Sequence, residues 1–156
     1  MRAEWRDRIV EVFQDIVGKQ AFMLVECLDK EDLPAGGEEF RRAAVRLRGD
    51  IQGQLTVIVP VEMCKEIAAN VLGIVSKENL AELRAEDSFV ELVNVVCGHL
   101  ATVLVGGERR ARGALPELST ISRDEWREAQ GDPDAIGFLV DDFPVLLTIA
   151  VEEASP

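Results

Sequence analysis

The sequence predicts an α+β domain in which helices cover an antiparallel β-sheet. Three observations support this prediction. Some segments repeat apolar residues at helical spacing, whereas others have the period of two that is expected of strands. The strand-like segments come in pairs joined by turns, as in antiparallel hairpins. A helix followed by a hairpin occurs at 4–59 and again at 86–152, so we expect a pseudo-twofold helix–hairpin repeat.

The first segments along the chain predict a helix, a strand and a loop. Apolar residues recur at helical spacing over 4–17, and Gly18 is expected to end this helix. The apolar run 21–28 predicts a short strand. The Pro- and Gly-containing stretch 29–39 predicts a polar loop.

A hairpin and a second helix are expected next. Residues alternate in 40–48 and again in 55–59, which predicts two strands across a turn at 49–53. Pro60 is expected to end the second strand, and 61–72 has the spacing of a helix.

The second half of the chain is expected to repeat this order. A long apolar segment predicts a helix at about 86–105. Ser122 and Glu125 have the spacing of a capping box, which predicts the start of a short helix. Alternating residues at 135–140 and 143–152 predict a second hairpin.

Length and charge limit the possible functions. The 156 residues fit a single domain, 1–156, with its own core. The formal net charge of −12 repels phosphate backbones and anionic membranes, so we expect neither nucleic acid nor membrane as a partner. The N-terminus has no apolar signal core, which favours a cytoplasmic protein.

The cysteines and the single histidine argue against a metal site in this chain. Cys27, Cys64 and Cys97 are far apart in sequence and lie in apolar stretches, so we expect reduced, buried thiols. His99 is expected to be partly buried and hydrogen-bonded rather than catalytic. The apolar stretch 89–105 is interrupted by polar residues, which favours a helix buried on nearly all sides of a soluble protein.

Four residues form a narrow polar stripe on the long helix. At about 100° per residue, Asp87, Glu91, Asn94 and Gly98 fall within an arc of roughly 60°. Such a stripe could be only the solvent edge of an amphipathic helix. A solvent edge usually carries several Lys and Glu residues, however, and this one has a carboxylate, an amide and a glycine that would let another molecule approach closely.

These residues resemble the active-site motif of the CheC/CheX chemotaxis phosphatases. The spacing Asp87-x-x-x-Glu91-x-x-Asn94, the glycine four residues after the asparagine, and Pro116 beyond the helix are similar to the CheX form in particular. The segment 48–55 resembles the family's Gly-x-hydrophobic-x-Gly hairpin. Chain length and element order agree from about 4 to 152, so the resemblance implies a CheC-like fold.

The resemblance also implies a function and roles for the residues. The family hydrolyses the aspartyl-phosphate of a CheY-type response regulator, with Mg²⁺ held by that partner. Asn94 would orient the attacking water and Glu91 would pair with the regulator's lysine, while Asp87, Gly98 and Pro116 would contact or shape the partner site. The resemblance further implies a homodimer. The alternative is a non-catalytic receiver-binding or flagellar-switch-like adaptor.

The first helix carries a similar spacing. Asp7-x-x-x-Glu11-x-x-Gln14 matches the pattern with Gln in place of Asn. An ordinary surface helix can show this by chance. The longer glutamine would place its amide about 1.5 Å further out, and misplacements of that size can cost about 10²-fold in rate. We therefore favour a silent remnant over a second active site.

Overall fold

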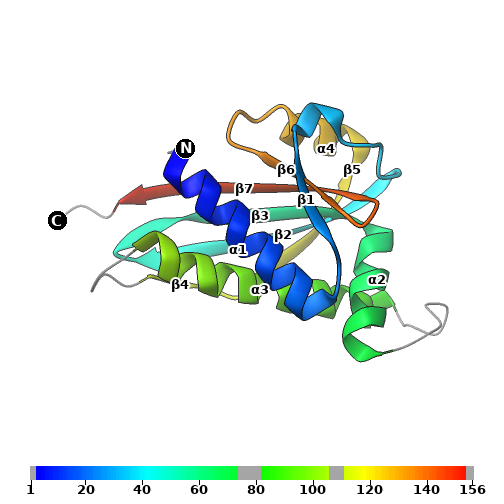
Figure 1. Ribbon diagram of the computed structural model, residues 1–156, viewed down its shortest axis with the longest axis horizontal. Helices are drawn as coiled ribbons and strands as arrows, with labels where there is room; N and C mark the ends of the chain where they lie inside the picture. Colours follow the sequence, from blue (N-terminus) through cyan, green and yellow to red (C-terminus); the bar gives the residue numbers. More distant parts are fainter. Residues whose placement is uncertain (1–2, 74–81, 106–110, 154–156) are drawn as a thin grey trace.

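The computed structural model describes residues 3–73, 82–105 and 111–153. In these residues the chain forms an antiparallel sheet with helices on both of its faces (Figure 1). The elements, in chain order, are α1 (Ala3–Ala21), β1 (Val25–Leu28), the 3-10 turn η1 (Lys30–Asp32), β2 (Glu39–Gly49), β3 (Ile51–Pro60), α2 (Val61–Leu72), α3 (Glu82–Val105), β4 (Ala111–Gly113), β5 (Glu117–Ser122), α4 (Arg123–Gln130), β6 (Ile136–Val140) and β7 (Phe143–Glu153).

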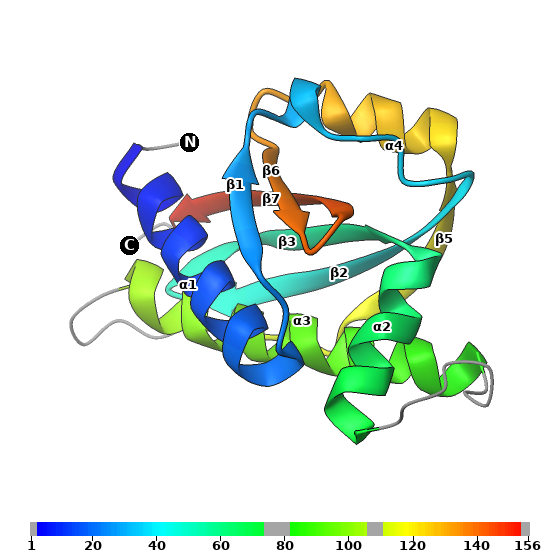
Figure 2. The same ribbon diagram turned by 45° about the vertical axis from the view of Figure 1, so that its right-hand side comes forward.

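The order of the strands confirms the pseudo-twofold repeat. The sheet runs β1-β6-β7-β3-β2-β4, and β5 also pairs with β2. The hairpins β2–β3 and β6–β7 meet at the central pair of β3 and β7 (Figure 2). Each hairpin is then extended by an outer strand of the other half, because β5 lies beside β2 and β1 lies beside β6.

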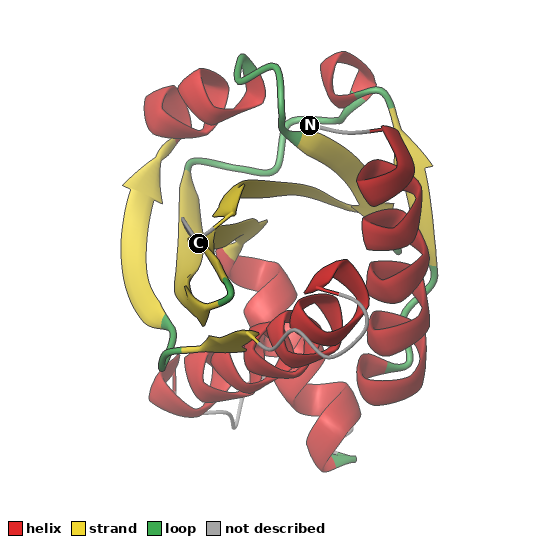
Figure 3. Ribbon diagram, turned by 90° about the vertical axis from the view of Figure 1, so that its left-hand side faces the viewer, coloured by secondary structure: helices red, strands yellow, loops and turns green. Residues whose placement is uncertain are grey.

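The two faces of the sheet have separate cores. The larger core lies between the sheet and α1, α2 and α3, and it includes Phe13, Leu55, Phe89 and Phe138. A smaller core lies on the other face under α4, where Trp126 stacks on Phe40 with ring centroids 4.6 Å apart. Figure 3 shows α4 separated from α2 and α3 by the sheet. The polar stripe therefore belongs to a helix of the larger core.

Helix α1 is longer than predicted, because Gly18 does not end it. It continues through Gly18 to Ala21, where Phe22 takes a left-handed conformation with φ 57°. An ion pair between Lys19 and Asp15 spans this last turn at 2.9 Å. The following strand starts only at Val25, so the predicted strand 21–28 was too long at its start.

Strand pairing also corrects the hairpin and the loops. The pairing between β2 and β3 ends at Leu47 and Gly53, where the sequence predicted a turn. Both strands continue past this point, however, because 47–49 pair with β4 and 51–53 pair with β7. The three-residue 3-10 turn and the short strands β4 and β5 were not predicted, because the turn is too short to show a period and both strands are mostly polar. The predictions for α2, for β6–β7 and for the Ser122 capping box are confirmed.

A buried ion pair fixes the start of α3 on the sheet. The side chain of Arg41 is only 7% exposed, and its Nε donates to Glu86 at 2.6 Å while a second nitrogen donates to Glu39 at 3.0 Å. Burial by itself lowers the pKa of the Arg41 guanidinium, but the bonds and charges of Glu86 and Glu39 raise it on balance. Glu86 directly precedes Asp87, the first residue of the stripe, so the ion pair between Arg41 and Glu86 positions the stripe.

Three predictions about burial need correction. Cys27 is exposed, because it lies on the outermost strand, β1, where the core cover ends, whereas Cys64 and Cys97 are buried as predicted. Burial raises the pKa of the Cys64 thiol to about 12 and that of Cys97 to about 11, so both stay protonated at neutral pH. His99 is exposed, and α3 is not buried on nearly all sides, since it has one open face.

Candidate functional site on helix α3

The polar stripe lies on the open face of α3. Asp87, Glu91, Asn94 and Gly98 are all exposed. The opposite side of the helix fills the larger core with buried apolar residues: Ala85, Phe89, Leu92, Val93, Val96, Cys97, Leu100, Ala101 and Leu104. The apolar side holds the helix on the sheet, and the stripe faces outward.

The groups of the stripe are available to another molecule. Within the described residues, the side chains of Glu91 and Asn94 make no hydrogen bond or ion pair. A Cβ built on Gly98 would meet no atom within 4 Å, so nothing within the described part of the chain requires glycine there. Glycine in a helix interior costs roughly 0.5–1 kcal/mol relative to alanine. A close approach by a partner is a reason to keep it.

A groove of about 360 Å³ adjoins the acidic end of the stripe. Asp87 and Glu91 line it together with Val71 at the end of α2 and Gln20 at the end of α1. Asn70 Nδ2 donates to the carbonyl oxygen of Ala21 at 2.9 Å and so ties these two helix ends together. Sequence reasoning missed Gln20 and Val71, because only the packing of three helices brings them beside the stripe.

Apolar side chains are exposed close to this groove. Val71 and Leu72 are each 49% exposed at the end of α2, and Phe22 is 70% exposed directly after α1. A carboxylate beside exposed apolar groups suits a protein partner, because burial of the apolar groups supplies affinity while the charge sets the register.

The structure places Pro116 on the other flank of α3. The strand β4 packs closely against this helix, since a Cβ built on Gly113 would lie 2.9 Å from Cys97 Sγ. Pro116 is half-buried in the link from β4 to β5. It therefore lies beyond the stripe rather than on it, and its contact with a partner stays a prediction.

The corresponding residues of α1 are held differently. Asp7, Glu11 and Gln14 are exposed. The Gln14 amide, however, donates from Nε2 to the carbonyl oxygen of Val25 at 3.5 Å. The amide of the α1 pattern is thus bonded to the chain's own backbone.

Comparison with known proteins supports the resemblance. The profile of the protein family described as chemotaxis phosphatase CheX matches residues 42–134, which is more than half of the chain and contains the whole stripe and Pro116. The chain belongs to the CheX family. No curated protein sequence matches it.

Solved CheX and CheC-like structures have the same fold. CheX from Vibrio vulnificus has a TM-score of 0.69 at 16% identity, covering 97% of this chain and 99% of its own. CheX from Borrelia burgdorferi, crystallised in a complex with CheY, BeF3 and Mg²⁺, has a TM-score of 0.66 at 13% identity, covering 97% and 100%. A CheC-like protein from a Shewanella species has a TM-score of 0.63 at 18% identity, covering 97% and 99%.

Two further features bear on the type of site. In the described part of the chain, no group of three His, Cys, Asp or Glu side chains is arranged to hold a metal ion. One described helix, over Ala85–Leu104, is long and apolar enough to cross a membrane by length and composition. In this CheX family member that segment is α3, a core helix whose apolar side packs on the sheet.

Proposed function

We propose that this CheX family member hydrolyses the aspartyl-phosphate of a CheY-type response regulator in two-component signalling. The observation that carries the proposal is the exposed Asn94 amide, which has no hydrogen-bond partner among the described residues, with Glu91 one turn before it and the open Gly98 one turn after it. The site offers no metal cluster of its own among the described residues, so Mg²⁺ is expected in the partner.

The chemistry that remains for this chain is the positioning of water. An acyl phosphate on a metal-bearing partner needs a water in line with phosphorus. The Asn94 amide can hold that water, because its NH₂ group donates and its carbonyl oxygen accepts a hydrogen bond. An amide is not a base, so the gain in rate comes from orientation.

Glu91 is proposed to fix the register of the complex. Its carboxylate is exposed and lines the groove, where it can pair with a lysine of the regulator. Asp87 lines the same groove and would add a second negative charge, whereas Gly98 would admit the partner's backbone. The exposed Val71 and Leu72 provide apolar contact area beside these groups.

The test is to measure loss of phosphate from phosphorylated receiver domains with and without this protein. Faster loss that saturates with protein concentration supports the phosphatase. Binding of the phosphorylated receiver without faster loss would favour the alternative, a non-catalytic adaptor, and would contradict the proposal. A receiver whose phosphorylated aspartate is replaced by asparagine provides the control.

We also propose that the protein is a cytoplasmic homodimer joined partly through a sheet edge. The outer strands β1 and β4–β5 each leave one side without a partner strand in the described residues. Such edges are usually covered. Sedimentation at about 50 μM would reveal the dimer through its concentration dependence, and a monomer at that concentration would contradict it.

A further inference from the structure

In the described part of the chain, the sheet face opposite α1–α3 is covered at only one end. The α4 core covers the apolar end, which includes Phe40, Ile58 and Leu146. Beyond that core, alternate residues of β2 point to the same face, namely Arg42, Ala44, Arg46 and Arg48. Two of their partners on β3 are polar, since Thr56 pairs with Ala44 and Gln54 with Arg46.

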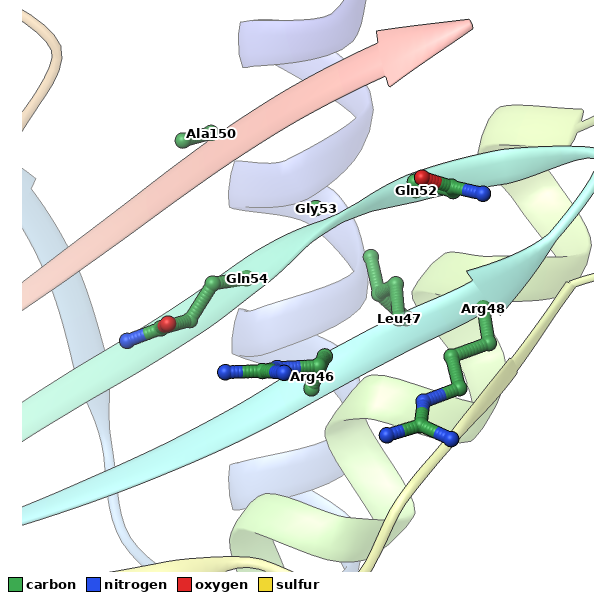
Figure 4. A pocket seen from close by; sticks show the side chains of 7 residues that line it. All are labelled: Arg46, Leu47, Arg48, Gln52, Gly53, Gln54 and Ala150. Carbon is green, nitrogen blue, oxygen red and sulfur yellow. The ribbon is translucent and has the colours of Figure 1, made fainter. Parts of the chain in front are cut away.

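Two adjoining hollows lie on this open face. A hollow of about 560 Å³ is lined by Arg46, Leu47, Arg48, Gln52, Gly53, Gln54 and Ala150. A second hollow, of about 300 Å³, shares Arg46, Arg48 and Gln54 with the first and adds Arg42 and Glu117 among its lining residues. Figure 4 shows Arg46 and Arg48 on β2 beside Gln52 and Gln54 on β3, with the helices behind the sheet. We call these hollows together the arginine trough.

The charge of the arginine trough contrasts with that of the whole chain. The protein carries a net charge of −12, yet Arg42, Arg46 and Arg48 lie together on this face. None of the three makes an ion pair with the described residues, and Arg42 Nε is buried there without a hydrogen-bond partner. Among the described side chains that line the trough, the one carboxylate is that of Glu117, which lies opposite Ala44 and is not paired with these arginines. The trough therefore has free donors for an anion.

The spacing of the charges selects the type of anion. At about 3.3 Å per residue, Arg42 and Arg46 are separated by roughly 13 Å along β2, and Arg46 and Arg48 by roughly 7 Å. A single phosphate is too small to reach all three. An extended peptide spaces alternate side chains by roughly the same 7 Å, so its carboxylates can match the arginines, and Gln52 and Gln54 can bond to its backbone.

We propose that the arginine trough binds an extended acidic segment of a partner protein. A second copy of this chain is a poor occupant, because a twofold contact across this face would place arginines against arginines. Nucleic acid and anionic bilayers are repelled by the net charge of −12 as soon as they extend beyond the trough. The trough lies on the opposite face from the α3 stripe, so the segment and a receiver can bind together.

The test is a titration with a fluorescent peptide of alternating glutamate and threonine, followed by fluorescence anisotropy. The matched peptide has glutamine in place of glutamate. The double variant Arg46→Gln/Arg48→Gln should bind the acidic peptide at least about tenfold more weakly than the unchanged protein. The control Arg6→Gln/Arg8→Gln removes the same charge from exposed positions of α1 and should change affinity less than about twofold.

Three outcomes would overturn the proposal. They are an absence of saturable binding below about 1 mM peptide, an equal loss of affinity in the α1 control, and equal binding of the glutamine peptide. Displacement of the peptide by an equal concentration of inorganic phosphate would also overturn it, since it would identify a small-anion site. Phosphatase activity should be unchanged in the double variant, so failure of this inference is distinguishable from failure of the proposed function.

Discussion

Helices α3 and α1 occupy equivalent places in the repeat and carry the same polar spacing, but among the described residues only the α1 amide has a hydrogen-bond partner. The Asn94 side chain makes no hydrogen bond with the described residues, whereas Gln14 donates to the carbonyl oxygen of Val25 at 3.5 Å. The glycines four residues on differ as well. A Cβ at Gly98 would meet nothing within 4 Å, but one at Gly18 would lie 3.9 Å from the carbonyl oxygen of Met23.

The difference arises from the connection that follows α1. Only Phe22 to Leu24 separate α1 from β1, so the chain returns at once along the helix end. Hydrogen bonds between Leu24 and Asp141 fix this return, with Leu24 N–H donating to Asp141 Oδ1 at 3.0 Å and Asp141 N–H donating to the Leu24 carbonyl oxygen at 2.8 Å. A shared position in a repeat therefore does not by itself make two equal sites. The neighbouring backbone decides which amide is available.

The largest expected effect is on the rate of receiver dephosphorylation, and it distinguishes the Asn94 amide from the Gln14 amide. Asn94→Ala should lower the rate of receiver dephosphorylation at least about 10²-fold, or roughly 2.7 kcal/mol, because the water loses its orienting group. Gln14→Ala should leave the rate unchanged. Phosphate release under single-turnover conditions measures both. If Gln14→Ala removed about half of the activity and Asn94→Ala left the other half, both helices would carry working sites.

A smaller effect is expected from the two glutamates. Glu91→Ala should weaken binding of a receiver that carries a phosphoryl mimic by about tenfold, because it leaves the partner's lysine unpaired in the interface. Glu11→Ala is the matched control on α1 and should bind normally. Isothermal titration with both variants and with Asn94→Ala tests the ranking. Affinity as high for Glu91→Ala as for Asn94→Ala would count against the register role.

The smallest effect concerns the two glycines. Gly98→Ala should raise the free energy of unfolding by up to about 1 kcal/mol, since alanine favours a helix and the site has room for its methyl group. The same substitution should reduce receiver affinity several-fold, because the methyl group obstructs close approach. Gly18→Ala should also stabilise the helix but leave receiver affinity unchanged. Denaturant unfolding and titration together measure this, and unchanged affinity of Gly98→Ala would remove the reason proposed for its glycine.

Most of the fold and the stripe could be predicted from the sequence, because both depend on local spacing. The helical period by itself places Asp87, Glu91 and Asn94 on one face of α3. The exposure of Cys27 and the groove residues Gln20 and Val71 could not be predicted, because they depend on which elements pack together. The hydrogen bond of Gln14 was equally inaccessible to sequence reasoning, since it depends on the path of the chain after α1.

The crosswise pairing of the outer strands has a consequence for how the chain folds. Since, among the described strands, β1 pairs only with β6 and β5 only with β2, neither half of the sequence can complete its own sheet. A fragment ending after β3 would have a hairpin without its central neighbour β7 and without its flanking strand β5. Each half of the sheet therefore depends on a strand from the other half. Helix α3 has a complete sheet to pack on only after strands that are distant in the sequence have paired.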